Sequence, residues 1–437
     1  MKHIKTWSLI LLTLSSITAW SQPANTDSLS LTKILSSVMQ NYPALKKADK
    51  QLVMADAKIG LTKTAYLPNV NFSASYNRIG PVTTIPFGGK ELQLYPPDMY
   101  NASVSVNQSI YDFGKTIKNL ALDQSSKKLV ELSVDQLKQQ LSMAVVANFY
   151  TINFLEEAIQ IKNDQLKTLN EHLQFVQKKA ATGSAIQYDI ITTKVRISSI
   201  ENQKIDLETA FQIQISQLNG FLGNPEDKPL LLKKELLEKQ ILPSVDSLCQ
   251  VAFTNRDEMK LALQKEQLAK SKLEVIKVQN NPSLNFIASG GFKNGYFNNN
   301  FGDTGKMNYA VGVGLNVPIF DANRNKYAKI QAKADLESNQ QDTELARRSI
   351  TNEVVESRAT AEASLKKVIQ SELQLKQATQ AYNLADINYK AGVITNLDLL
   401  DSFTALSESK LALYKTKIDY SVSLLKLKIA LGQRIYE

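Results

Sequence analysis

Cysteine and histidine are almost absent from this sequence. The 437-residue chain has one cysteine, Cys249, and two histidines, His3 and His172. A single cysteine cannot form an intramolecular disulfide bond. One cysteine and one histidine on separate segments supply neither a zinc site nor a Cys/His catalytic pair. We therefore expect Cys249 and His172 to be ordinary side chains.

Chemical motifs and charge runs are also missing. The sequence has no nucleophile–base pair, no metal cluster and no phosphate-binding loop, so we predict that the chain is not an enzyme and holds no cofactor or metal ion. The formal net charge is +9, but the basic residues are spread along the chain without a basic run. This distribution favours solubility over nucleic-acid binding.

Long apolar runs are absent beyond the N-terminus. There, a basic start is followed by an apolar run over 7–19 and by Ala19-Trp20-Ser21, with small residues at the −3 and −1 positions. This pattern predicts a secretory signal peptide, 1–21, and a mature chain that begins at Gln22. The run is too short for a membrane anchor, which needs about 20 apolar residues. The sequence therefore predicts an exported protein without a transmembrane helix, and no cysteine follows the signal to carry a lipid.

Proline and glycine are missing from two long stretches. Residues 115–219 contain no proline and one glycine, Gly183, and residues 319–437 contain no proline and only Gly392 and Gly432. Both stretches are rich in helix-forming residues. Their apolar residues recur at steps of three and four, as in coiled coils. Each stretch predicts two long helices that meet at a glycine, the first of them about 100 Å long.

Short alternating segments precede each helical pair. In the segment at 70–77, for example, Val70 and Phe72 alternate with Asn71 and Ser73. Such a strand suits a soluble sheet over a core or a membrane β-barrel, and the export signal favours the barrel. Four strands cannot close a barrel, and lipid does not tolerate open sheet edges. Other copies of the chain must supply the missing strands. Three copies give twelve strands, and this argument does not exclude two or four copies.

The two halves of the sequence repeat each other. From the second strand onward, corresponding residues lie 209 positions apart, so a unit of about 200 residues is present twice. The matched pairs include Asp112 with Asp321, Gly183 with Gly392, Asp189 with Asp398, and Gly223 with Gly432.

The helix–turn–helix tip at 389–401, with its paler copy at 178–189, resembles that of the TolC-like outer membrane factor family. In both copies, a glycine is followed six residues later by an aspartate. The resemblance covers essentially all of the mature sequence. It implies a mixed α and β membrane protein, a trimeric 12-stranded outer-membrane β-barrel with four strands per chain, continued by a long α-helical coiled-coil barrel. It also implies the outer membrane of a Gram-negative bacterium, with extension into the periplasm.

The expected domain organisation follows the duplication. A first repeat, 22–223, is joined by a linker, 224–243, in an equatorial belt to a second repeat, 244–437. The first repeat is expected to contain a short helix, a long helix, strands 70–77 and 100–110, and long helices 115–181 and 186–220. The second repeat is expected to contain strands 283–292 and 309–319 and long helices 322–391 and 396–431.

The resemblance further implies a function. Family members are passive exit ducts of tripartite efflux or secretion systems. The implied partners are two further copies of the chain, a periplasmic adaptor (membrane fusion protein), an inner-membrane pump or ABC transporter, and outer-membrane lipid. An open tube exerts little chemical selection, so cargo specificity is expected to lie with the pump. The alternative, a trimeric coiled-coil surface stalk or adhesin, predicts a passenger domain instead of duplicated strand pairs.

The tips carry the candidate site residues. By resemblance, Asp398 and Asp401 correspond to a ring of aspartates at the periplasmic gate. Tyr389 and Asp189 stand at positions linked to closed-state hydrogen bonds. The chain departs from the family's best-known member at Ile394, where that member has an arginine that forms an ionic latch.

Two further interpretations concern the same region. Judged from the residues alone, Asp398 and Asp401 can equally be solvated acids at a helix N-terminus, where the helix dipole favours them. The turns, with Gly183 and Ser184 in one and Gly392 and Val393 in the other, are the expected adaptor-docking tips.

Overall fold

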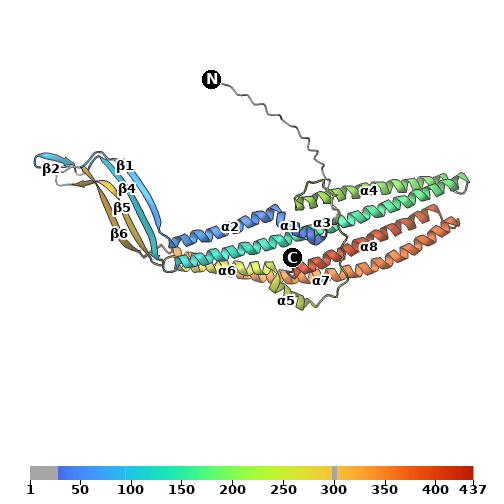
Figure 1. Ribbon diagram of the computed structural model, residues 1–437. Coiled ribbons are helices and arrows are strands. Elements are labelled where there is room, and N and C mark those ends of the chain that lie inside the picture. Colours follow the sequence, from blue (N-terminus) through green and yellow to red (C-terminus); the bar gives the residue numbers. More distant parts are fainter. Residues whose placement is uncertain (1–27, 94, 298–302, 437) are drawn as a thin grey trace, which may run out of the picture.

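The molecule is elongated, with a curved β-sheet at one end and a long bundle of helices that continues from it (Figure 1). The computed structural model describes residues 28–93, 95–297 and 303–436. The expected signal peptide, 1–21, lies outside the described residues. Two helical hairpins reach the end opposite the sheet, and their turns form the tips (Figure 1).

The sheet combines strands from both repeats. Its four main strands are antiparallel, in the order β1-β4-β5-β6. They are β1 (Asn69–Arg78), β4 (Asp98–Tyr111), β5 (Ser283–Phe297) and β6 (Asp303–Asn316). The repeats meet where β4 pairs with β5, with Val104 opposite Gly290. Within the described residues, β1 and β6 each have a hydrogen-bonded neighbour on one side only. β6 begins earlier than expected. It also ends earlier, at Asn316, because Pro318 lacks the N–H that a ladder needs.

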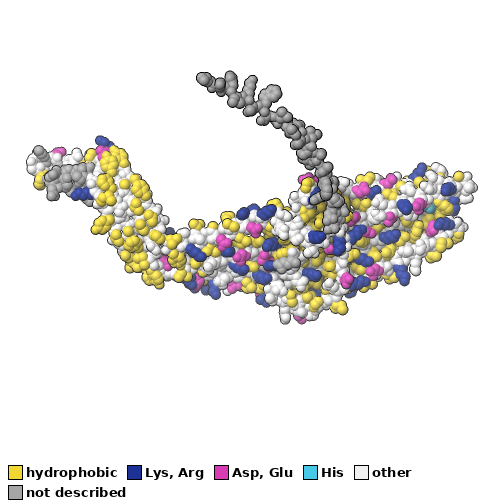
Figure 2. Space-filling model, viewed as in Figure 1, with side chains coloured by type: hydrophobic (Ala, Val, Ile, Leu, Met, Phe, Trp, Pro, Cys, Tyr) yellow, Lys and Arg dark blue, Asp and Glu magenta, His cyan; other side chains and the backbone are white. Residues whose placement is uncertain are grey.

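The sheet has large apolar side chains on its surface. Every residue of β1 is exposed. On β6, Tyr309, Val311 and Val313 are exposed, Tyr309 at 86%, and they alternate with Ala310 and Gly312. Hydrophobic side chains cover much of the sheet in Figure 2. A soluble sheet would bury one of its faces on a core, so this arrangement favours the membrane-barrel interpretation of the alternation over the soluble sheet.

The connection between β1 and β4 contains a hairpin where the sequence suggested only a turn-rich loop. β2 (Thr84–Phe87) pairs antiparallel with β3 (Lys90–Gln93). Gly88 and Gly89 connect them with φ values of 62° and 80°. Two left-handed residues form the type of tight turn whose twist matches that of paired strands.

Four long helices account for nearly half of the chain. They are α3 (Lys115–Ala181), α4 (Gln187–Leu222), α7 (Arg324–Lys390) and α8 (Asn396–Ala430). Their bounds differ from the expected ones by a residue or two. α3 packs along α4, and α7 packs along α8. The two hairpins are joined mainly through α3 and α8, so the duplicated units lie side by side.

Both hairpins begin in the same way. The carboxylate of Asp112 accepts hydrogen bonds from the backbone N–H groups of Gly114 (3.0 Å) and Thr116 (2.6 Å) at the start of α3. Its counterpart Asp321 accepts one from the N–H of Asn325 (3.0 Å) at the start of α7. An acidic side chain thus satisfies helix N–H groups that have no partner within the helix. The repeat seen in the sequence is therefore also a repeat of local structure.

The main buried core lies partway along the helices. There α1 (Leu31–Asn41) packs against the first hairpin, with Val38, Phe149 and Leu218 fully buried. The linker between the repeats contributes Leu232, and it forms a β-bridge with the N-terminal segment. This core holds the hairpins together partway along their length, and the tips form a separate region.

Three more helices flank the hairpins. They are α2 (Pro43–Lys63), α5 (Val245–Asn255) and α6 (Asp257–Val278). α2 packs on α3, and α6 packs on both α3 and α7. In the described part of the chain, no helix combines the length and apolar character that crossing a membrane requires.

Candidate functional site at the helical tips

The two tips have matching backbone turns. Gly183 and Gly392 have φ values of 75° and 78°, a left-handed conformation that side chains other than glycine rarely adopt. The amide after each glycine, that of Ser184 or Val393, donates to a carbonyl near the helix end over 2.8 Å. Such bonds close the C-terminus of a helix. All four residues are exposed at the end of the molecule farthest from the sheet.

Asp398 caps its own helix. Its Oδ2 accepts hydrogen bonds from the backbone N–H (2.9 Å) and the hydroxyl (2.6 Å) of Thr395, and its own N–H donates to that hydroxyl. These bonds form a capping box. They lower the pKa of the exposed Asp398 carboxyl below its usual value. In the first tip, only half of this arrangement forms: Asp189 accepts from the N–H of Ile186, which has no side-chain oxygen to reciprocate.

Asp401 makes an ion pair with the other hairpin. Its Oδ1 lies 2.9 Å from a guanidinium nitrogen of Arg196 on α4. Asp401 is exposed and Arg196 is partly exposed. The pair links α4 to α8 near the tips, beside the buried contact of Ile197 and Ile200 with Leu400 and Phe403. Arg196 was not among the residues singled out by the sequence, since it lies far from Asp401 along the chain and belongs to no motif.

Tyr389 is buried between the hairpins. Its ring lies against His172 and Phe175 of α3, with centroid distances of 5.4 and 6.2 Å. The ammonium group of Lys179 lies 4.8 Å from the centre of the Tyr389 ring. Burial, followed by the nearby Asp189 carboxylate, raises the pKa of the tyrosine hydroxyl. Within the described residues of one chain, this hydroxyl makes no hydrogen bond to Asp189.

Asn396 connects three helices behind the tips. It is 4% exposed, and its amide nitrogen lies 3.3 Å from both the carbonyl of Asp189 and the hydroxyl of Thr193 on α4. Its Oδ1 lies 2.7 Å from Nε2 of His172 on α3. Because an amide oxygen can only accept, Nε2 of His172 carries the proton and donates. The sequence suggested an ordinary side chain at His172, but this contact ties it to the second hairpin.

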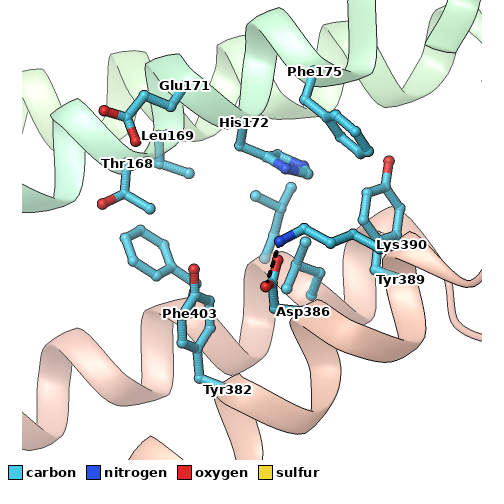
Figure 3. Close-up of a pocket in the computed structure, with 12 residues that line it drawn as sticks. Thr168, Leu169, Glu171, His172, Phe175, Tyr382, Asp386, Tyr389, Lys390 and Phe403 are labelled. Carbon is cyan, nitrogen blue, oxygen red and sulfur yellow. Dashed lines mark hydrogen bonds and ion pairs between the residues drawn. The ribbon is translucent and has the colours of Figure 1, made fainter.

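A cavity lies between α3 and the second hairpin. Its volume is about 290 Å³, and side chains of α3, α7 and α8 line it (Figure 3). The lining includes the rings of His172, Tyr382, Tyr389 and Phe403. In the same view, Lys390 reaches back over the cavity to Asp386, with 2.7 Å between its ammonium nitrogen and a carboxylate oxygen.

Burial of the His172 ring is expected to make the stability of the tips depend on pH. Burial lowers the pKa of His172; the Asn396 hydrogen bond and the Asp386 and Asp189 carboxylates act in the opposite direction, and Lys179 acts with burial. The unfolded chain therefore takes up this proton at a higher pH than the folded chain. The stability that the neutral ring contributes is complete above about pH 6.5 and declines as the pH falls below that value.

This dependence can be measured by thermal unfolding of the wild type and His172→Gln at a series of pH values. Glutamine can donate to Asn396 but does not titrate. We expect the melting temperature of the wild type to fall relative to that of the variant as the pH is lowered below about 6.5. A difference that stays constant with pH would show that His172 does not titrate differently in the folded state.

The described residues contain no group of three or more His, Cys, Asp or Glu side chains that could hold a metal ion. The tips contain an ion pair, helix caps and an aromatic cavity.

Comparison with known proteins assigns this architecture. The family model of the outer membrane efflux protein matches residues 34–224 and 248–433, once for each repeat. The chain is 20% identical over 433 residues to the outer membrane protein TolC of Escherichia coli strain K12. The alignment covers 97% of this chain and 85% of that protein. It is 21% identical over 417 residues to the solvent efflux pump outer membrane protein SrpC of Pseudomonas putida, covering 92% and 85%.

Solved structures agree on the fold. The outer membrane protein VceC of Vibrio cholerae superimposes with a TM-score of 0.75 at 18% identity, covering 93% of this chain and 97% of that one. CusC superimposes with a TM-score of 0.78 at 17% identity, covering 92% of each chain. At such low identities, these structures show a shared fold of long helices and a four-stranded sheet.

Proposed function

Since the chain belongs to the outer membrane efflux protein family, we propose that it is the passive exit duct of a tripartite system, fed by an inner-membrane pump through a periplasmic adaptor. The protein is a bacterial outer-membrane efflux channel of the TolC type, it extends into the periplasm, and it works in a trimeric assembly. The duplicated hairpins below a sheet with two open edges are the observation that carries the proposal. No feature of the described residues favours the stalk or adhesin alternative.

The open sheet edges support closure by copies of the same chain. Three antiparallel steps separate β1 from β6, so the two edge strands run in opposite directions. β6 of one copy can therefore pair antiparallel with β1 of the next, and three copies supply twelve strands. The exposed side chains of Tyr309, Val311 and Val313 would then face lipid. Closure removes the edges, which would be costly in a membrane.

The acidic residues of α8 fit a gate at the periplasmic end. Asp398 and Asp401 are three residues apart, so they lie near one another on the helix, and both are exposed in the single chain. If three copies converge at the tips, six carboxylates approach a common axis. Like charges in a narrow pore repel one another and attract cations. The capping role of Asp398 is compatible with this, because a cap uses only part of the carboxylate's capacity to accept hydrogen bonds.

The Arg196–Asp401 pair is the proposed latch of that gate. It joins the two hairpins of a chain near the tips and can take the place of the ionic latch that Ile394 removes. An exposed ion pair stabilises a contact by no more than about 1 kcal/mol. Three such pairs in a trimer are weak enough to be released when an adaptor docks.

Replacing Arg196 by glutamine is expected to raise the single-channel conductance of the purified trimer in a planar bilayer. The substitution removes the pair but leaves every gate carboxylate in place. Lys194→Gln is the matched control, since it makes the same change of charge at an exposed site on α4 that forms no ion pair in the described structure. An equal rise in both variants would mean that net charge, not the latch, sets the conductance.

The exposed turns are the proposed adaptor-docking surface. Gly183, Ser184, Gly392 and Val393 lie at the far end of the hairpins, and Val393 presents an exposed apolar side chain. An adaptor bound there would affect the Arg196–Asp401 pair through the first turns of α4 and α8. The duct itself is tested by the same bilayer measurement: a folded trimer that conducts no current, in the wild type and in the latch variant alike, would refute it.

A further inference from the structure

The cavity between the hairpins has the features of a binding site for a small organic cation. Figure 3 shows aromatic rings on both sides of it: His172 on α3 faces Tyr382 and Tyr389 of α7 and Phe403 of α8. A volume of about 290 Å³ can hold a two-ring molecule with a short side chain. The faces of tyrosine and phenylalanine rings attract cations.

Among the residues that line this cavity, acidic groups outnumber basic groups, and Lys179 lies against two of the lining rings. Glu171 and Asp386 contribute carboxylates to the lining, and Lys390 contributes the one ammonium group among the residues that line it. Lys390 is 60% exposed, and its pair with Asp386 joins successive turns of α7. Such a pair adds little stability, because the side chain is mobile and water competes for both charges. Another ammonium ion can therefore take its place on Asp386.

Two of the aromatic rings that line the cavity already contact a cation. The ammonium group of Lys179 lies 5.2 Å from the centre of the Phe175 ring and 4.8 Å from that of Tyr389. Both rings line the cavity, on the side toward the tips. These contacts show that the rings present their faces at distances suited to a positive charge.

We propose that this cavity binds a small aromatic ammonium ion of the arylalkylamine class. The ammonium group pairs with Asp386 in place of Lys390, and the aromatic body packs among Tyr382, Phe403 and His172. A ligand in this position contacts both hairpins. Binding requires only the folded tips and goes beyond the proposed duct function.

The test uses tryptamine as the probe. Both tryptophans of the sequence, Trp7 and Trp20, lie in the expected signal peptide, so the processed protein has no indole fluorescence of its own. Fluorescence anisotropy of tryptamine added to the purified processed trimer then reports binding directly. Tryptophol, in which a neutral hydroxyl replaces the amine, is the matched ligand. We expect tryptamine to bind about tenfold more tightly than tryptophol, because only tryptamine carries the charge.

Two variants test the position of the charge. Asp386→Asn is expected to weaken tryptamine binding about tenfold and to leave tryptophol binding unchanged. Lys390→Gln is expected to strengthen tryptamine binding, because it removes the competing ammonium group, and a gain of affinity cannot result from misfolding. Asp342→Asn is the control, since it makes the same change at an exposed site elsewhere on α7.

The outcomes separate this site from the duct. No tryptamine binding, equal binding of the two ligands, or equal effects of Asp386→Asn and Asp342→Asn would overturn the proposal even if the trimer conducts current. Specific binding by a trimer that does not conduct would refute the duct and support the site.

Discussion

A trimer that carries both Asp398→Asn and Asp401→Asn is expected to lose most of the wild type's preference for cations over anions, measured from reversal potentials in a salt gradient across a planar bilayer. The reason is the proposed convergence of six carboxylates at the narrow end of the pore. Their combined field concentrates cations and repels anions at the constriction. Divalent cations in the bath should block the wild type and have little effect on the double variant.

Asparagine is the informative replacement because of the hydrogen bonds at the start of α8. An alanine at position 398 would remove the acceptor for the N–H and hydroxyl of Thr395 and would cost about 1 kcal/mol through loss of that half of the capping box. Asparagine keeps an acceptor oxygen and removes only the charge. The double variant also breaks the pair with Arg196, and Arg196→Gln alone shows the effect of that loss with both carboxylates intact.

The two effects can therefore be separated. We expect Arg196→Gln to raise conductance and to keep the cation preference, whereas the double variant loses the preference as well. A double variant as cation-selective as the wild type would place the constriction elsewhere along the pore. Asp398 and Asp401 would then be surface acids of a helix N-terminus, the interpretation that the residues alone left open.

The second large effect is expected at Gly432, near the C-terminus. Its φ is 74°, and a Cβ atom there would lie 2.6 Å from the backbone of Asn255 and Arg256, where α5 ends and α6 begins. Gly432→Ala thus combines a left-handed alanine, at about 1–2 kcal/mol, with overpacking against a rigid backbone, at about 1–3 kcal/mol. We expect a clear drop in the melting temperature and in the yield of trimer, followed by circular dichroism and gel filtration.

The duplication supplies matched controls for this prediction. Gly223, the counterpart of Gly432, has a φ of 72° but nothing within 4 Å of an added Cβ, so Gly223→Ala measures the backbone cost alone. Gly220 lies inside α4 with open space around it, and Gly220→Ala should stabilise the helix by up to about 1 kcal/mol. If Gly432→Ala melts no lower than Gly223→Ala, the close approach to α6 has no energetic importance.

Several features of this protein follow from the sequence because they are local or repeated. The absence of proline and glycine determines where the long helices run, and the lone Gly183 and Gly392 determine where they turn. The match of Asp112 with Asp321 anticipates two helix caps with the same design. Each of these features depends on neighbouring residues or on periodicity, so the amino-acid sequence alone contains the information. Helix ends are less certain, which is why some bounds differ by a residue or two.

The strands were anticipated less completely. Alternation located all four strands of the main sheet, but the hairpin of β2 and β3 went unrecognised within a segment that appeared to be a loop. Its strands are only four residues long, too short for alternation to stand out. Gly88-Gly89 was the available signal, since two adjacent glycines favour a tight hairpin turn.

The contacts of the proposed gate and of the proposed binding cavity were decided only by the tertiary structure. Arg196 pairs with Asp401, His172 with Asn396, and Asp386 shares a cavity with Phe403 and residues of α3. Helical periodicity shows which side chains share a face. It does not show which other helix that face contacts or where along the helix the contact occurs. Those choices depend on how the two repeats pack side by side, and that packing is set by burial summed over the whole length of the helices.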